Sequence, residues 1–341
     1  MATTIISACL PPNIDPTKAH IAFQDRALPK LNEQLCGDDL TIKQCALMSL
    51  CDLLHNPEYI QQAITCSVIP TLLVLLCDVD ITVRMKTSEA FLLISGHAIG
   101  RQVIIEQNVI NPLSLLFNDE CYTTRLNVYH TIERLALGAP GTESVVGCGL
   151  MPLLIANLET DTDEIKVIIL LTLNHCMRVN FVEALHSNAM LVCKSLLSHF
   201  NFSIRTYAAM AIKELSLTTD GKNQACDEGC IPLLVKLLKD EEVSVRAQSC
   251  AALSAITITT RGKRETLKFN VIPTVLQLLL DLNVEIRLNA LKLISNLSEA
   301  PEGRKELLES VDYVSSLKSD YDSAAVRKAA QIAEKMILWK P

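Results

Sequence analysis

Apolar residues recur along the chain in a phrase that is clearest in residues 231–238. A proline stands in its second position, and four leucines follow with the spacing i, i+1, i+4 and i+5, which places them on one face of a helix. Proline fits the first turn of a helix, because its missing N–H would have no helical partner there. After a short acidic break, apolar and small residues keep helical spacing from 243 to 256. The phrase therefore predicts two consecutive helices.

The same phrase defines a repeat along most of the chain. Its anchor residue is usually proline, and successive anchors are 39 to 42 residues apart. A basic residue follows each anchor by fourteen positions, or by thirteen in the third repeat. Because two independent marks share one register, the sequence predicts eight repeats of ~41 residues. The anchors are Pro29, Pro70, Pro112, Pro152, Leu191, Pro232, Pro273 and Tyr313. The basic residues are Lys43, Arg84, Arg125, Lys166, Arg205, Arg246, Arg287 and Arg327.

A further short helix is predicted between successive repeats, for example over residues 262–270, which begin with a glycine turn. Two or three helices in about 40–47 residues are typical of an all-α, armadillo/HEAT-type right-handed α-solenoid. Each repeat of such a fold leaves an apolar face that its neighbour covers. We therefore expect one solenoid over residues 19–341, ending in an amphipathic capping helix at 322–339. Residues 1–18 contain three prolines and predict an extended N-terminal arm.

Composition and charge exclude several classes of partner. The chain has 31 Lys and Arg residues against 38 Asp and Glu residues, a formal net charge of −7, whereas nucleic-acid binders usually need a basic surface to release counterions. The longest apolar stretch, 68–77, is too short to span a membrane. The N-terminus lacks the features of a signal peptide, and the thirteen cysteines are scattered without a C-x-x-C pair. We expect a soluble cytoplasmic protein with reduced core thiols that binds neither nucleic acid nor membrane.

The motifs that carry catalysis or bind cofactors are not found in the sequence. Gly221-Lys222 and Gly262-Lys263 lack the upstream glycine of a phosphate-binding loop, so we interpret them as turns at the start of helices. Cys226 and Cys230 stand one helical turn apart, but no second pair with matching spacing completes a zinc site. None of the seven histidines is singled out as a partner for a cysteine nucleophile. The sequence predicts no enzyme, no metal, no cofactor and no small-molecule substrate.

The helix that carries the basic residue presents the predicted partner site. Positions three, six, seven and ten after that residue are mostly apolar or small and should be buried, whereas positions five and nine lie on the other face and should line a concave groove. We call these fifth and ninth positions the groove stripe. Their mixed character suits a specific protein partner, such as a helix laid along the groove. The candidate residues are Asp52, Glu89, His130, Arg134, His175, Met210, Glu214, Lys292 and Asn296.

The two chain ends offer further candidates. Pro11, Pro12 and Trp339 are candidate terminal docking residues, and Trp339 equally suits a lid over the last repeat.

An acid precedes several of the basic residues by four positions, in the pairs Asp39/Lys43, Asp80/Arg84 and Glu242/Arg246. These acids could form a row of ligand-binding charges. We favour a structural interpretation, in which an acid at a helix N-terminus pairs with the base one turn later or the pair links adjacent repeats.

The repeats resemble the armadillo family. Residues 229–238, Gly-Cys-Ile-Pro-Leu-Leu-Val-Lys-Leu-Leu, are similar to the armadillo consensus, as are residues 290–298. The two ends are similar to those of radial-spoke armadillo proteins of cilia and flagella, in residues 11–19 and 26–33 and again in 299–304 and 326–335.

This narrower resemblance implies a structural subunit of the axonemal radial spoke, which joins outer doublet microtubules to the central apparatus and relays control to dynein. It implies other radial spoke proteins of the stalk, neck or head as partners. The alternative is a cytoplasmic adaptor for protein cargo or complex assembly. An importin-type adaptor for basic peptides is not expected, because such adaptors use ladders of Trp and Asn in the groove and only Asn296 matches here.

Overall fold

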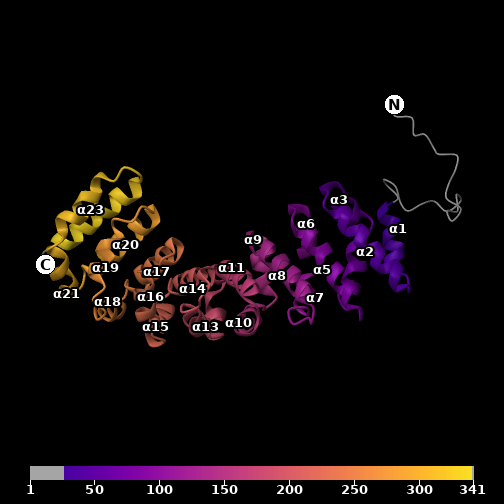
Figure 1. Ribbon diagram of the computed structural model, residues 1–341, viewed down its shortest axis with the longest axis horizontal. Coiled ribbons are helices and arrows are strands. Elements are labelled where there is room, and N and C mark those ends of the chain that lie inside the picture. The colour runs from indigo at the N-terminus through magenta and orange to yellow at the C-terminus, as the bar shows by residue number, and fades with distance from the viewer. Residues whose placement is uncertain (1–26, 340–341) are drawn as a thin grey trace, which may run out of the picture. The chain divides into compact units, whose positions relative to one another are not determined.

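The computed structural model describes residues 27–339, which form helices joined by loops (Figure 1). Within that range there are twenty-three α-helices and one 3₁₀ helix, and no strand. The first repeat contributes two helices to the described range, and each of the seven that follow contributes three α-helices. We call these the first helix, the second helix, which contains the anchor, and the third helix, which contains the basic residue. The predicted all-α repeat fold is confirmed.

The chain divides into two compact units, of which the first ends at Arg134 and the second begins at Leu135. The helices that start in the first unit are α1 (Ala27–Leu35), α2 (Leu40–Leu54), α3 (Pro57–Thr65), α4 (Val68–Leu75), α5 (Ile81–Ser95), α6 (Ala98–Glu106), α7 (Ile110–Ser114) and α8 (Tyr122–Ala136). In the second unit, repeats four to six comprise α9 (Ala139–Gly147), α10 (Met151–Thr160), α11 (Asp163–Val179), α12 (Phe181–His186), α13 (Ala189–Leu196), α14 (Phe202–Leu215), α15 (Thr219–Asp227), α16 (Cys230–Leu237) and α17 (Val243–Ile256). Repeats seven and eight comprise α18 (Thr260–Leu267), α19 (Ile272–Leu278), α20 (Val284–Leu297), α21 (Pro301–Leu308), α22 (Val311–Ser316), the 3₁₀ helix η2 (Leu317–Ser319) and α23 (Ala324–Leu338).

The sequence register agrees with these bounds in every repeat. Each anchor lies within the first three residues of a second helix, where proline is tolerated, and each basic residue is the fourth residue of a third helix. The predicted C-terminal helix at 322–339 is α23, and the predicted N-terminal arm, with Pro11 and Pro12, lies outside the described residues.

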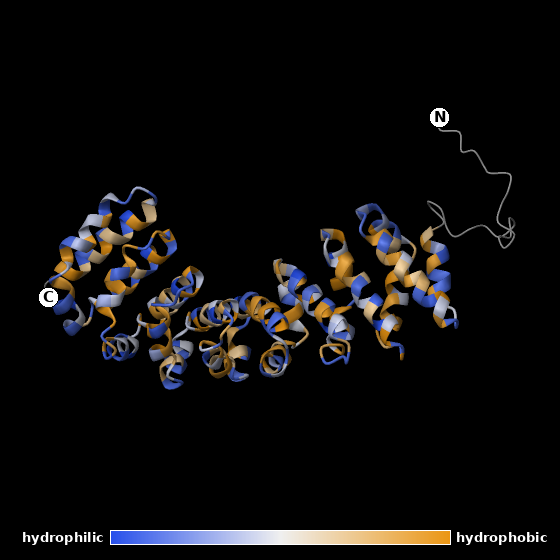
Figure 2. Ribbon diagram, in the orientation of Figure 1, coloured by the Kyte–Doolittle hydropathy of each residue, from blue (hydrophilic) through white to orange (hydrophobic). Residues whose placement is uncertain are grey.

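The third helices form the core of each unit. In the second unit α11, α14, α17, α20 and α23 pack side by side in chain order, and in the first unit α2 packs against α5. Figure 1 shows α13 and α15 on one side of α14 and α17. The third, sixth, seventh and tenth positions after the basic residue are buried in all six repeats from Arg84 to Arg287, as Ser249, Ala252 and Ile256 illustrate. The predicted buried face is confirmed, and Figure 2 shows hydrophobic and hydrophilic residues together on the same helices.

Glycines near the start of the first helices allow a close backbone approach. A Cβ atom on Gly262 would lie 2.2 Å from the carbonyl oxygen of Ile256, at the end of the preceding third helix. The same crowding recurs at Gly221, where the corresponding distance to the Leu215 oxygen is 1.8 Å. Both glycines lie in the first turn of a helix, and the N–H of Gly262 donates to the capping hydroxyl of Thr259 at 3.1 Å. The interpretation of these glycines as helix-start turns is confirmed.

The described cysteines range from buried to exposed, with Cys66, Cys121 and Cys148 half-buried. Burial raises the pKa of the Cys193 and Cys250 thiols to about 12, so both stay protonated at neutral pH. The prediction of core thiols is wrong for Cys36, Cys45 and Cys77, which are exposed and free. These three lie at helix ends or on outer faces, where the repeat needs no apolar side chain.

Among the described residues, no single helix is long and apolar enough to cross a bilayer. Two helix pairs, bent by 88° and 84°, reach the required length and composition only together.

Candidate protein-binding surface

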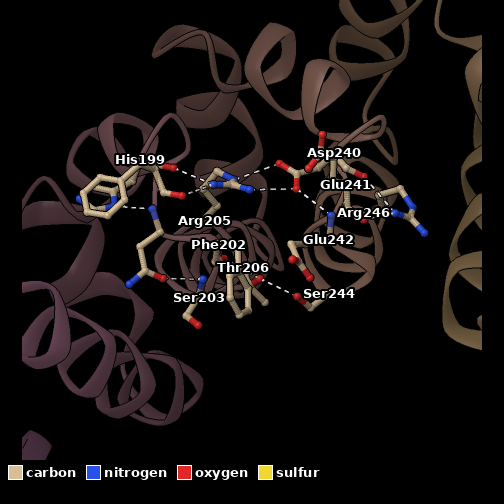
Figure 3. A network of polar contacts seen from close by, with 12 residues as sticks. His199, Phe202, Ser203, Arg205, Thr206, Asp240, Glu241, Glu242, Ser244 and Arg246 are labelled. Carbon is tan, nitrogen blue, oxygen red and sulfur yellow. Dashed lines mark hydrogen bonds and ion pairs between the residues drawn. The ribbon is translucent and has the colours of Figure 1, made fainter.

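The basic residue of the repeat lies at the junction between two repeats. In α17, Arg246 Nη1 donates to the backbone oxygens of Asp240 and Glu241, both at 2.9 Å, in the loop before its own helix. Its Nη2 donates to Asp281 Oδ2 of the next repeat at 2.8 Å. We call this combination an arginine clasp. Figure 3 shows the preceding clasp, in which Arg205 reaches Asp240.

The clasp recurs at other junctions, where it ties one loop to the next. The clasp aspartate also accepts a backbone N–H from its own loop, as Asp281 does from Asn283 at 2.9 Å. One carboxylate therefore shapes its loop and joins two repeats. The other ion pairs of this kind are Lys43 with Asp78 at 3.2 Å, Arg84 with Asp119 at 2.6 Å, Arg205 with Asp240 at 2.9 Å and Arg287 with Asp320 at 2.9 Å.

The acids four positions before the basic residues have a different role from the one expected. Asp39 and Asp80 cap their helices, because each accepts a backbone N–H three residues on. Within the described range, neither forms an ion pair with the base one turn later. The one-turn pair is therefore wrong, but the expected link between adjacent repeats is confirmed for Asp80, whose Oδ1 accepts a hydrogen bond from Gln44 Nε2 of the preceding repeat at 3.0 Å. The basic residues themselves reach a different aspartate in the next repeat. The missed signal was an Asp that follows the base by 35 residues at four junctions and by 33 residues at Asp320.

Two clasp aspartates have a lowered pKa. Burial favours the neutral form of Asp281, but the N–H of Asn283 and the Arg246 guanidinium outweigh it and hold the pKa of that carboxyl below its usual value. The pKa of Asp320 is lowered in the same way, by Arg287 and the N–H of Ser323 against the effect of burial. These two carboxylates are therefore ionised at neutral pH and face an arginine of opposite charge.

The fifth repeat, whose anchor is Leu191, departs from this pattern. His199 stands at the position of the clasp aspartate, and its Nδ1 accepts the N–H of Asn201 at 3.1 Å. The ring proton is therefore assigned to Nε2, which lies 3.4 Å from Asp163 Oδ1 of the preceding repeat. The junction between repeats four and five thus uses a histidine and an acid on the third helix instead of an arginine clasp.

The groove stripe lies on the third helices but is only partly open to solvent. The fifth and ninth positions after Arg246, Ala251 and Ala255, are buried, contrary to the prediction for the stripe. Among the candidate residues, Asp52 and Lys292 are exposed, and the others except Glu214 are half-buried: Glu89, His130, Arg134, His175, Met210 and Asn296. Two of these join third helices to each other. Arg134 Nη1 donates to the Leu92 oxygen at 2.7 Å, and Asn296 Nδ2 donates to the Ser254 oxygen at 2.8 Å.

Glu214 corrects the predicted stripe. We expected an exposed groove residue, but the side chain of Glu214 is only 6% exposed. Its Oε1 accepts a hydrogen bond from Arg178 of the preceding third helix and forms an ion pair with neighbouring Lys213, both at 3.1 Å. Long basic side chains cover this carboxylate, so it links α11 and α14 and charge reversal there would cost stability.

Trp339 follows α23 and is half exposed. The Arg304 guanidinium lies 4.9 Å from the centre of its indole ring, a cation–π geometry that ties the chain end to α21. The ring thus covers part of the last repeat, as the lid interpretation expects, and its role in docking stays a prediction.

The described residues offer little for chemistry. No group of three or more His, Cys, Asp or Glu side chains in that range is arranged to hold a metal ion. Cys226 and Cys230 are both buried, and burial raises their thiol pKa values to about 11 and about 12. The surfaces that remain are suited to binding another protein.

Comparison with known proteins gives the following. The sequence model of a family described as Armadillo-like matches residues 151–335, more than half of the chain. An engineered protein of known crystal structure superposes with a TM-score of 0.82 at 19% identity, over 92% of this chain and 79% of that one. A designed armadillo repeat protein superposes with a TM-score of 0.60 at 22% identity, over 67% of this chain and 99% of that one. Another designed armadillo repeat protein, solved in complex with the peptide (KR)4, superposes with a TM-score of 0.61 at 17% identity, over 66% of this chain and 98% of that one.

Proposed function

The chain belongs to the armadillo-like family, and from that premise we propose that it is a non-enzymatic scaffold subunit of the axonemal radial spoke. It binds other radial spoke proteins through the groove stripe and the closed C-terminal end, and it helps relay control to dynein in motile cilia and flagella. The observation that carries the scaffold role is the row of third helices, which presents exposed and half-buried side chains of mixed charge in successive repeats.

The location in the spoke is supported by the resemblance of the chain ends to a radial spoke head armadillo protein. The C-terminal part of that resemblance includes residues 299–304, at the start of α21, and residues 326–335, within α23. These helices belong to the eighth repeat, and we take that repeat as a second surface for a neighbouring spoke subunit.

The clasps support a mechanical role. Each arginine clasp joins two repeats with a carboxylate that is largely shielded from water, as in Arg246 and Asp281, whose side chains are 19% and 13% exposed. Shielded pairs are weakened by salt less than exposed pairs are. A stack joined in this way resists sliding of one repeat past the next, which suits a subunit that transmits force.

Affinity purification of the tagged full chain from ciliated cells tests the proposal. We expect stalk, neck or head proteins of the spoke to be recovered in a fixed ratio that survives high-salt washing. Recovery with cytosolic transport or assembly factors alone would reject the spoke and favour the adaptor alternative.

A matched pair of charge reversals tests the stripe. Lys292 on α20 and Lys268, directly after α18, are both exposed and neither forms an ion pair with a described residue. We expect Lys292→Glu to reduce recovery of spoke proteins severalfold and Lys268→Glu to leave it unchanged, with equal thermal stability. Equal recovery with both variants would remove the stripe from the proposal.

A further inference from the structure

The loops between second and third helices form a second surface in the second unit. The residue after each clasp position stands at the tip of its loop, and four successive tips are Phe200, Glu241, Leu282 and Tyr321. We call these four residues the tip ridge. It is separate from the groove stripe, which lies along the third helices.

The clasps fix the tips in a row. Arg205 donates to the Phe200 oxygen at 2.8 Å and also holds Asp240, which precedes the next tip. Arg287 donates to the Leu282 oxygen at 3.0 Å, and its guanidinium pairs with the acids on both sides of Tyr321. Arg246 makes the intermediate connection in the same way. The ridge is therefore a continuous series of loops whose backbones are held by charged hydrogen bonds.

Three of the four tips expose large apolar side chains almost completely. Phe200 is 84% exposed, Leu282 94% and Tyr321 99%, and Leu280 in the same loop as Leu282 is 72% exposed. Single exposed apolar residues are ordinary on protein surfaces. Leu280, Leu282 and Tyr321 are different, because they lie on two successive, rigidly held loops, and exposed apolar residues gathered in this way indicate an interaction site. The charged tip Glu241 separates them from Phe200.

The charges around the ridge indicate which partner fits. The clasp aspartates are paired with arginines, so the exposed charges outside these pairs decide the local potential. Three such acids, Glu241, Glu242 and Glu285, lie in these loops or at the adjoining helix starts, against one exposed lysine, Lys239. Asp322 is also exposed and shares Arg287 with Asp320, which leaves one further negative charge there. The surface is apolar at its crest and acidic around it.

We propose that the tip ridge binds a basic amphipathic helix of another protein, laid along the stack. The apolar face of that helix covers Leu282 and Tyr321, and its flanking Lys or Arg residues pair with the acids. Helices that pack side by side are about 8–10 Å apart, a distance that about six residues of helix span at ~1.5 Å per residue. Apolar residues one heptad apart on the partner therefore reach successive tips. An anionic membrane surface would be repelled by the same acids.

A synthetic peptide tests this surface on the full-length chain. The probe is a fluorescein-labelled helix of about 20 residues with leucines on one face and lysines beside them, followed by fluorescence anisotropy. We expect the double variant Leu282→Ser with Tyr321→Ser to weaken binding at least tenfold. The control Ile258→Ser removes an apolar residue that is 60% exposed in the loop between α17 and α18, and it should change affinity less than twofold. Both variants should melt like the parent chain.

Charge and partner class are tested with the same assay. A peptide with glutamates in place of the lysines should not bind, and Glu241→Lys should weaken the lysine peptide severalfold. The proposal would be overturned if the lysine peptide did not bind, or if the lysine and glutamate peptides bound equally. It would also be overturned if the double variant bound the lysine peptide as tightly as the parent chain does. So would co-sedimentation of the chain with phosphatidylcholine–phosphatidylserine vesicles in place of peptide binding. None of these results bears on recovery of spoke proteins through the groove stripe, so the two proposals fail separately.

Discussion

Removal of a clasp arginine should destabilise one junction of the stack by more than a surface ion pair would. Arg246→Ala deletes hydrogen bonds to two loop oxygens and leaves Asp281, with a side chain only 13% exposed, without its charged partner. An exposed ion pair contributes at most about 1 kcal/mol, and breaking a fully buried one costs about 3–5 kcal/mol. With both side chains less than one-fifth exposed, we expect a loss of about 2–3 kcal/mol.

The assay is a double-mutant cycle on chemical unfolding followed by circular dichroism. Arg246→Ala, Asp281→Asn and the double variant are compared with the parent chain, and Lys292→Ala serves as an exposed control that should stay within ~0.5 kcal/mol. We expect a coupling free energy of about 1–2 kcal/mol between the two side chains. Hydrogen exchange should accelerate first in α17 and α20, because repeat stability is a sum of local and nearest-neighbour contributions. Additive single effects, or a loss below ~1 kcal/mol for Arg246→Ala, would refute the clasp as a joint between repeats.

Three further predictions follow from the geometry. Gly262→Ala should lower the free energy of unfolding by about 1–3 kcal/mol in thermal melts, because the added Cβ would lie 2.2 Å from a backbone oxygen. Gly147→Ala is the control, since its Cβ would have no neighbouring atom within 4 Å, and it should be neutral or slightly stabilising. Equal melting temperatures of the two variants would contradict the assigned crowding at Gly262. The pKa of Asp281 is lowered in the folded protein, so its contribution to stability is complete above its unfolded pKa of about 3.9 and is lost as the pH falls through the folded value. Asp281→Asn should therefore make the free energy of unfolding fall less steeply with acidification. An unchanged pH dependence would contradict the lowered pKa of Asp281. Alkylation followed by mass spectrometry should modify exposed Cys77 rapidly and buried Cys193 only after unfolding; the reverse order would mean that the two burial assignments are wrong.

The repeat register could be predicted because its causes act within one helix. Proline at the start of a second helix and apolar residues on the buried face of a third helix impose residue types at fixed intervals, so Pro232 and Arg246 identify their positions from sequence alone. The fold therefore followed from the pattern, including the fifth repeat, where Leu191 replaces the proline.

The clasp partner was not predicted, because it depends on how two repeats pack. Asp281 lies eight residues after its anchor and Asp320 seven, so no single offset within a repeat identifies both. The stripe shows the same limit. Glu214 occupies an outward position on its own helix, yet Arg178 from the neighbouring helix covers it. A face assigned from one helix cannot include the side chains of the next.

The clasps also raise the question of why ionised residues are used at these junctions. A shielded ion pair is often no more stable than well-packed apolar residues of similar size, so the clasp at Arg246 and Asp281 has to be explained by more than stability. Its distinctive feature is that one guanidinium fixes the backbone oxygens of a loop and the acid of the next loop together. We therefore expect Arg246→Met with Asp281→Leu to cost less free energy of unfolding than Arg246→Ala alone. The same double variant should nevertheless speed hydrogen exchange in the loops at 240–242 and 281–283 and weaken peptide binding at the tip ridge. Slow exchange and full peptide affinity in the apolar variant would show that packing alone positions the tips.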